Sequence, residues 1–265
     1  IMFLSEQFEY NGISSDTMGV SCISVDTSGM KESPFGIKRN IQEEQINGRD
    51  IPYFNGFEKE CLTFKMTIGK INEDDLEWTF EERKKIAEWL YTDYYAPLLS
   101  LDNPEVIYYC TPIDDGSRFD NGLFHGYITV TMKCNAPYPF SPTYIEQYNH
   151  KQAISDIIEI NNLSNISKYY YPEIQVHSED TSFKLVNLTN GGEELIFNNI
   201  DKGETIYINN QMKQIESDKK DFKGNKVYRL SNFNKNWFKL VKGVNRIKVV
   251  GDVDVIFRCS YPITI

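Results

Sequence analysis

Histidine, cysteine and clustered carboxylates are the residues most able to hold a metal, and none is spaced for it in this sequence. The three histidines, His125, His150 and His177, stand far from one another, and none has the short spacing to another His or Cys that zinc sites use. The stretch from Asp114 to Asp120 offers too few regularly spaced oxygen ligands for a calcium loop. We therefore expect no metal and no cofactor.

Four pairs of adjacent carboxylates could supply the acid and the base of a glycoside hydrolase, which needs two carboxylates flanking a sugar. They stand at residues 43–44, 74–75, 114–115 and 193–194. Each falls in a predicted turn or exposed end, where Asp and Glu are ordinarily solvated. The motifs G-x-x-x-x-G-K, G-x-S-x-G and H-E-x-x-H are also absent from the sequence. We predict no catalytic residues, with glycan hydrolysis kept as an alternative.

Aromatic side chains are the remaining candidates for binding. Three consecutive tyrosines stand at residues 169–171, and Trp237 is followed by Phe238. Because ring faces can bury the apolar faces of sugars, we predict Tyr169, Tyr170 and Trp237 as contacts for a saccharide or a protein partner. The alternative is that these rings fill a core or a subunit contact, where aromatics are common. Alternation along a strand puts Trp237 and Phe238 on opposite faces, so at most one of them should face a core.

Composition narrows the class of protein. The chain has 265 residues, 40% of them hydrophobic and 14% aromatic, which is typical of a folded protein with room for two domains. Its formal net charge of −10 argues against a surface that neutralises nucleic-acid phosphates. An acidic channel through which DNA slides remains compatible, since like charge repels the backbone.

Cysteine usage and hydropathy suggest where the chain is made. The five cysteines are an odd number, widely spaced and without a C-x-x-C pair, so we expect reduced and mostly buried thiols in a protein synthesised in a cytoplasm. We also expect a soluble chain that is not exported through a signal peptide, because neither a basic and apolar leader nor a run of about 18 apolar residues is present.

One helix is predicted, and it begins at a capping box formed by Thr79 and Glu82. Three apolar residues of this helix share one face and should pack inward, namely Ile86, Trp89 and Leu90. Pro97 disfavours helical geometry just before it, so the helix should end by residue 95. Strand patterns at residues 62–68, 106–111 and 127–134 surround it. A mainly β protein with a single helical brace is therefore expected.

Residues 28–52 interrupt these strands with a stretch rich in charge, Asn, Gly and Pro. We expect an extended hairpin or arm there, exposed and suited to docking on a neighbouring subunit. Its basic residues Lys38, Arg39 and Arg49 are the predicted assembly contacts.

The second half has a different pattern of predicted elements, with short strands separated by turns and no helix. The strands are expected at residues 183–188, 195–197, 205–208, 227–230, 237–240, 246–250 and 253–257. This pattern is typical of a β-sandwich or jelly roll. Pro139, Pro142 and the polar stretch that follows indicate a boundary, giving predicted domains at 1–148 and 149–265.

The order of these pieces resembles the distal tail proteins of phages with long non-contractile tails. The similar segments are FEYNGISSD at 8–16, the helix containing Trp89 and Leu90, PLL at 97–99, the strand at 106–109, GYITVTMKCNAPY at 126–138, NLTNG at 187–191 and WFKLVKGVNRI at 237–247. The resemblance covers nearly the whole chain and rests on order and spacing.

The resemblance implies a fold and a role. The first half would be the β-rich ring-forming belt domain, and the second a galectin-like β-sandwich. The protein would form a hexameric ring at the tail tip of a virion, joining the tail tube protein to the tail-associated lysin and the receptor-binding or baseplate proteins, with an open lumen through which DNA leaves. It would not bind DNA specifically, contact a membrane or catalyse a reaction. The alternative is a module that binds host cell-wall saccharide through the C-terminal sandwich.

Overall fold

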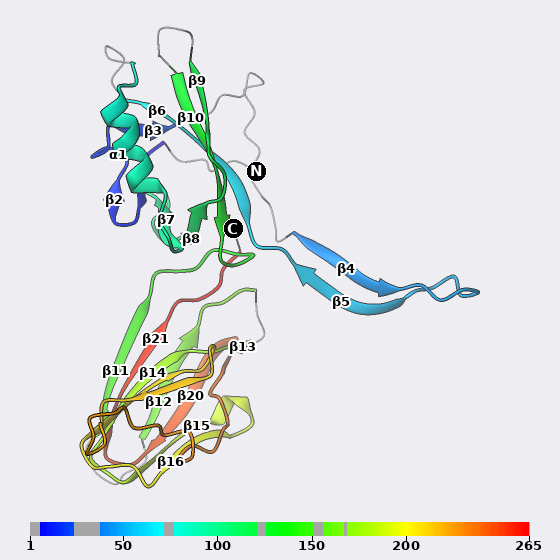
Figure 1. Cartoon of the computed structure of the whole chain (residues 1–265). Helices are drawn as coiled ribbons and strands as arrows, with labels where there is room; N and C mark the ends of the chain where they lie inside the picture. Colours follow the sequence, from blue (N-terminus) through cyan, green and yellow to red (C-terminus); the bar gives the residue numbers. More distant parts are fainter. Residues whose placement is uncertain are drawn as a thin grey trace. The chain divides into compact units, whose positions relative to one another are not determined.

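Alternating apolar and polar residues make this chain mainly β, as the sequence predicts. The computed structural model describes residues 6–23, 38–71, 77–120, 126–150, 156–166 and 169–264, leaving aside the side chains of Asp120 and His150, and within these ranges it has 21 strands and a single α-helix (Figure 1). The chain divides into two units, the first made of the residues up to Ser141 together with Thr264, and the second spanning Pro142–Ile263.

The first unit is built on an eight-stranded sheet in the order β2-β1-β7-β8-β10-β6-β3, with β9 paired to β10. Its strands are β1 Phe8–Tyr10, β2 Ile13–Ser14, β3 Val20–Cys22, β6 Thr63–Lys70, β7 Ala96–Ser100, β8 Ile107–Pro112, β9 Ser117–Asp120 and β10 Gly126–Cys134. Asn11 and Gly12 join β1 to β2 with φ of 52° and 76°. These positive values are the ones a two-residue type I′ hairpin turn requires.

The helix α1 spans Phe80–Leu90 and begins at the predicted capping box. The Thr79 hydroxyl accepts from the Glu82 amide, and the Glu82 carboxylate accepts from the Thr79 amide at 2.9 Å. Trp89 then fixes the helix to the sheet, because its indole N–H donates to the Tyr10 carbonyl at 2.9 Å and its ring stacks on Phe8 at 5.7 Å. The predicted inward face, Ile86, Trp89 and Leu90, is buried.

Two sheets form the second unit. The five-stranded sheet runs β11-β21-β14-β17-β18, with β11 Tyr144–His150, β21 Val253–Cys259, β14 Glu173–Ser178, β17 Glu204–Asn209 and β18 Gln214–Ser217. The four-stranded sheet runs β12-β20-β15-β16, with β12 Asp156–Asn162, β20 Gly243–Val250, β15 Ser182–Asn187 and β16 Glu193–Asn198. A short 3-10 turn, η1 Leu188–Asn190, follows β15, and β13 Tyr169–Tyr170 pairs with β19 Leu240–Val241. One apolar core draws residues from both sheets, which makes this unit a β-sandwich.

The unit boundary falls before the predicted one at 148/149. Residues 144–150, which look polar in sequence, form β11 and pair along their whole length with β21. Because β11 is the edge strand of its sheet, polar side chains such as Gln147 and Asn149 can face solvent. This segment therefore belongs to the second unit.

Several strands differ from the predicted set. Residues 97–99, just after the predicted end of the helix, lie in β7, where the Pro97 carbonyl accepts from the Asn11 amide at 2.9 Å and Leu98 is buried. The strands β12 and β14 lie at residues where the sequence pattern predicts no strand. Conversely, residues 227–230 are not a strand, and of residues 237–240 only Leu240 belongs to one. Tyr228 and Leu230 are 82% and 51% exposed there, while Arg229 between them points inward, so two of the apolar residues of this stretch face outward.

Candidate functional site: an exposed hairpin and a sheet groove

Part of the predicted arm is a β-hairpin. Its strands are β4 Arg39–Glu44 and β5 Tyr53–Lys59, and within the described residues they pair with each other and with no other strand (Figure 1). Residues 28–37 of the predicted arm lie outside the described residues. A hairpin of two strands is marginally stable by itself in water, so a partner is expected to cover it.

Cross-strand register gives the hairpin one polar face. Asn40 donates to the Glu60 carboxylate at 2.6 Å, and Gln42 donates to the Glu58 carboxylate at 2.8 Å. Lys38 adds an ion pair to Glu60 at 2.6 Å. These contacts already satisfy the polar face.

The opposite face carries three exposed apolar side chains, together with Arg39, Lys59 and Glu43. Ile41 pairs with Phe57, and Phe54 follows on the same face because a bulge at residues 42–43 shifts the register. Gly56, with φ of 123°, supplies the backbone conformation that this bulge uses. Ile41, Phe54 and Phe57 are 58%, 61% and 46% exposed. We call these three residues the apolar face of the hairpin.

The three predicted basic residues each contact this hairpin differently. The Arg39 guanidinium lies 4.4 Å from the centre of the Phe57 ring, beside the apolar face. Arg49, near the tip, lies over the Tyr53 ring and donates to its hydroxyl. Lys38 pairs with Glu60 at the base. A role for all three in assembly stays a prediction.

The predicted aromatic contacts of the second unit are drawn into packing. Tyr170 and Trp237 are partly buried against the core, with Tyr170 at 4.8 Å from Tyr261 and Trp237 at 5.0 Å from Phe233, measured between ring centres. Tyr169 carries the Lys239 ammonium over its ring at 4.6 Å. The three residues keep only part of their surface for a ligand, and their contact role stays a prediction. Phe238 is 3% exposed and Trp237 packs against the same core, so the expectation that at most one of the two rings faces a core is wrong. Residues 237 and 238 lie outside any strand, so the alternation of a strand does not apply to them.

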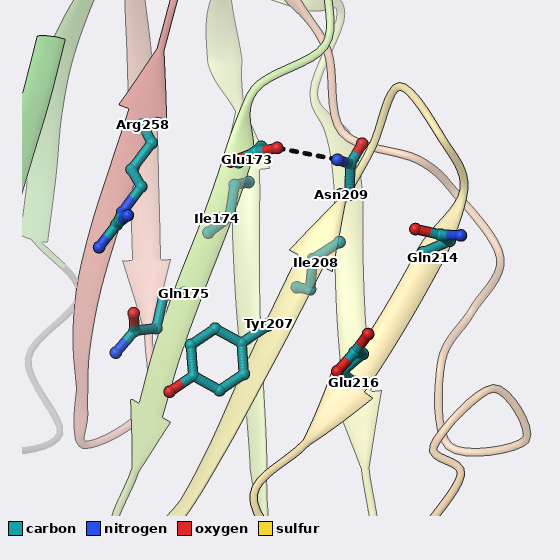
Figure 2. A pocket seen from close by; sticks show the side chains of 9 residues that line it. All are labelled: Glu173, Ile174, Gln175, Tyr207, Ile208, Asn209, Gln214, Glu216 and Arg258. Atoms are coloured by element: carbon teal, nitrogen blue, oxygen red, sulfur yellow. Dashed lines mark hydrogen bonds between the residues drawn. The ribbon is translucent and has the colours of Figure 1, made fainter. Parts of the chain in front are cut away.

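A groove that sequence analysis missed lies on the outer face of the five-stranded sheet (Figure 2). Its floor includes the backs of two core residues, and its walls are outward side chains of four neighbouring strands: Glu173, Gln175, Tyr207, Asn209, Gln214, Glu216 and Arg258. The alternation of polar residues along each of these strands was visible in the sequence. Their meeting in one place depends on strand order, which sequence alone does not give.

The residues considered for chemistry serve local structure. The Asp114 carboxylate accepts from the amides of Gly116 and Thr131, and these bonds hold its pKa below the ordinary value although burial opposes them. Glu193 and Glu194 pair with Lys239 and Lys184. The pair at 74–75 and His125 lie outside the described residues.

The remaining chemical groups are the thiols and His177. The five cysteines, all within the described ranges, form no disulfide, and three of them are buried; burial raises the pKa of Cys259 to about 11. His177 contacts Thr205 and Glu179 on the sheet. Across the described ranges, no group of three His, Cys, Asp or Glu side chains is placed to hold a metal. Nor does any helix in those ranges have the length and apolarity to span a membrane.

Known proteins match the whole chain. A SPbeta prophage-derived protein of Bacillus subtilis (strain 168), YomH, is 26% identical over 258 residues, covering 97% of each chain. The crystal structure of the Dit (gp 19.1) protein of phage SPP1, described as a hub of the adsorption apparatus of phages infecting Gram-positive bacteria, superposes with a TM-score of 0.65 at 13% identity and covers 96% of this chain and 98% of that one. A chain of the phage p2 baseplate in its activated conformation with Sr gives 0.53 at 10% identity, covering 96% and 97%.

Two family models divide the sequence between them. The phage tail protein N-terminal domain matches residues 3–136, and the phage tail C-terminal domain matches residues 140–259. The structural similarity to SPP1 Dit also extends over nearly the whole chain, and so over both matched regions. The chain therefore belongs to the phage tail protein family and has the fold of the Dit protein of phage SPP1.

Proposed function

We propose that this protein forms a closed ring, a hexamer, at the tip of a phage tail, and that the hairpin β4–β5 joins each subunit to the next. The observation that carries the proposal is the uncovered apolar face of Ile41, Phe54 and Phe57 in a chain of the phage tail family. A hairpin that meets a different surface on its neighbour makes a heterologous contact, and repeated heterologous contacts close into a ring when the rotation permits.

The energetics favour a covered hairpin. Fully burying a Phe or Ile side chain is worth roughly 1.5–3 kcal/mol, and all three residues leave about half of that surface in water. Arg39 beside Phe57 is suited to the rim of such a contact, since Arg and aromatics are enriched at interfaces. The satisfied polar face, with its amide–carboxylate pairs, would stay in solvent.

In this role the ring joins the tail tube protein on one side to the tail-associated lysin and the receptor-binding or baseplate proteins on the other. DNA passes through an open lumen without specific binding, which the net charge of −10 supports. The protein is made in the host cytoplasm, resides in the virion and acts by assembly, without catalysis.

The mass of the purified chain in solution tests the ring. Native mass spectrometry should give about 185 kDa, six copies of the 30.8 kDa chain, or twice that for two stacked rings. Negative-stain images should show an open centre. Two results together would overturn the proposal: the purified chain stays monomeric at high concentration, and it does not bind to phage tails assembled without this protein.

Two variants test the hairpin. The Glu60 amide donates to the Lys38 carbonyl at 3.2 Å, so the two ends of the hairpin meet and residues 39–59 can be replaced by a two-residue Asn-Gly turn. This variant, and the double variant Phe54→Ser with Phe57→Ser, should be folded and monomeric. The matched control is Asn40→Ser with Gln42→Ser on the polar face, which should still assemble. Normal rings from the hairpin-less chain would remove the hairpin from the assembly mechanism.

We infer saccharide recognition by the second unit as a second candidate function, through Tyr169, Tyr170 and Trp237. The observation that favours it is the Lys239 ammonium over the Tyr169 ring, which places a donor beside an aromatic face. Loss of binding to host-wall polysaccharide in Trp237→Ala, with the fold intact, would support it. Absence of binding by the unmodified chain would exclude it.

A further inference from the structure

The groove on the five-stranded sheet is made of two rows of residues in register. One row crosses the sheet as Arg258, Glu173, Asn209 and Gln214, and the next runs through Gln175, Tyr207 and Glu216. Neighbouring strands lie about 4.8 Å apart, and successive outward residues of one strand about 6.6 Å apart, so the side chains form a compact grid. Figure 2 shows them standing on β21, β14, β17 and β18, on the face away from the core.

Part of this grid is already fixed. The Asn209 amide donates to the Glu173 carboxylate at 2.8 Å, and its carbonyl oxygen accepts from the Met212 amide at 2.8 Å. Glu216 is paired with Lys226 at 3.0 Å. These contacts hold two carboxylates and one amide in place before any ligand arrives.

The other polar groups of the grid are free. In the part of the chain that the structure describes, the side chains of Gln175, Tyr207, Gln214 and Arg258 make no hydrogen bond or ion pair. Together they offer a hydroxyl, two amides and a guanidinium, which is a mixed set of donors and acceptors. A ligand rich in hydroxyl groups matches such a set.

The charge and shape of the groove narrow the ligand further. Glu173 and Glu216 are balanced by Arg258 and Lys226, so the site as a whole is close to neutral and does not select a polyanion. Tyr207, which is 47% exposed, presents a ring amid the polar groups. The groove measures about 280 Å³, near the lower end of small-ligand sites.

We propose that this groove binds a short segment of a neutral saccharide, with Tyr207 stacking on a sugar face and Gln175, Gln214 and Arg258 bonding to its hydroxyls. The proposal goes beyond the assembly role. It also uses other residues than Tyr169, Tyr170 and Trp237, so substitutions can test the two sets separately, and ring formation is measured by mass.

The test uses the full-length chain with two soluble probes, an N-acetylglucosamine tetramer and a glucose tetramer. Calorimetry or NMR titration up to about 10 mM should show millimolar binding of at least one probe. Tyr207→Ala and Arg258→Gln, on different strands, should each weaken it about tenfold or more. The matched control is Tyr228→Ala, which removes an 82% exposed tyrosine of the same unit outside the groove and should leave affinity unchanged.

Three results would overturn the proposal. One is no binding of either probe over that range, and another is binding that survives both groove substitutions. The third combines two observations: the unmodified chain binds no sugar, and the Tyr207→Ala chain forms rings but no longer joins other tail proteins. That result would assign the groove to a protein partner.

Discussion

Glu204 is a fully buried carboxylate that accepts four hydrogen bonds from three residues. It accepts from the Asp201 amide at 2.8 Å, from the Ser217 hydroxyl at 2.6 Å and from two nitrogens of Arg229 at 2.8 Å each. Arg229 also pairs with Asp201 at 2.6 Å. This network attaches the irregular stretch after β18 to the five-stranded sheet.

Arg229→Ala should destabilise the second unit by about 3–5 kcal/mol, because it leaves the Glu204 charge buried and unpaired. Urea unfolding monitored by tryptophan fluorescence measures the loss. The control is Lys226→Ala, which breaks the exposed pair with Glu216 and should cost under about 1 kcal/mol. Equal losses in the two variants would contradict the role given to burial.

The same pair sets an acid limit. Burial alone would raise the pKa of Glu204, but the bonds from Arg229, Ser217 and the Asp201 amide hold it below the ordinary 4.5. A carboxylate with a lowered folded-state pKa contributes stability above its unfolded pKa and loses it as pH falls through the folded value. The free energy of unfolding should therefore decrease as the pH is lowered beneath about 4.5. The decrease should be smaller in the Glu204→Gln variant than in the unmodified chain.

Among the elements, α1 depends on its cap. Thr79→Ala removes the hydroxyl that accepts from the Glu82 amide and should cost about 1 kcal/mol, within a usual range of 0.5–2. Thr79→Ser keeps the acceptor and should behave like the unmodified chain. Chemical unfolding of the first unit gives the measurement, and no difference between the Ala and Ser variants would show that packing through Trp89 alone sets the helix start.

For the whole molecule, the unit boundary is testable with two fragments. Each unit has its own core, drawn in the first from residues 8–134 and in the second from residues 158–261. Residues 142–263 should fold alone with a cooperative transition. Residues 149–265 should be unstable, because that cut removes most of β11 and exposes the edge of β21. A stable fragment 149–265 would restore the boundary predicted from composition.

Local pattern carried much of this fold. The period-two alternation at residues 62–68 predicts β6, and the Thr79–Glu82 spacing predicts the start of the helix. The Asn11-Gly12 pair is likewise a local signal, since it favours the two-residue turn found there. Each depends on residues within a few positions of one another, so the sequence suffices. The sequence does not predict β11, because a solvent-exposed edge strand can have the same polar composition as a linker between domains.

Only the tertiary structure shows which residues lie together on the surface of each unit. Arg229 lies in the alternating stretch at residues 227–230, and it faces inward because it binds the buried carboxylate of Glu204. Glu204 stands 25 residues earlier in the sequence, so local pattern does not reveal the pair. The apolar face of the hairpin requires the bulged register that sets Phe54 and Phe57 beside Ile41. The groove joins residues from 173 to 258 through strand order. Side-chain alternation is a local property of the backbone, whereas strand order and register are fixed by long-range packing, and the sites of this protein depend on the latter.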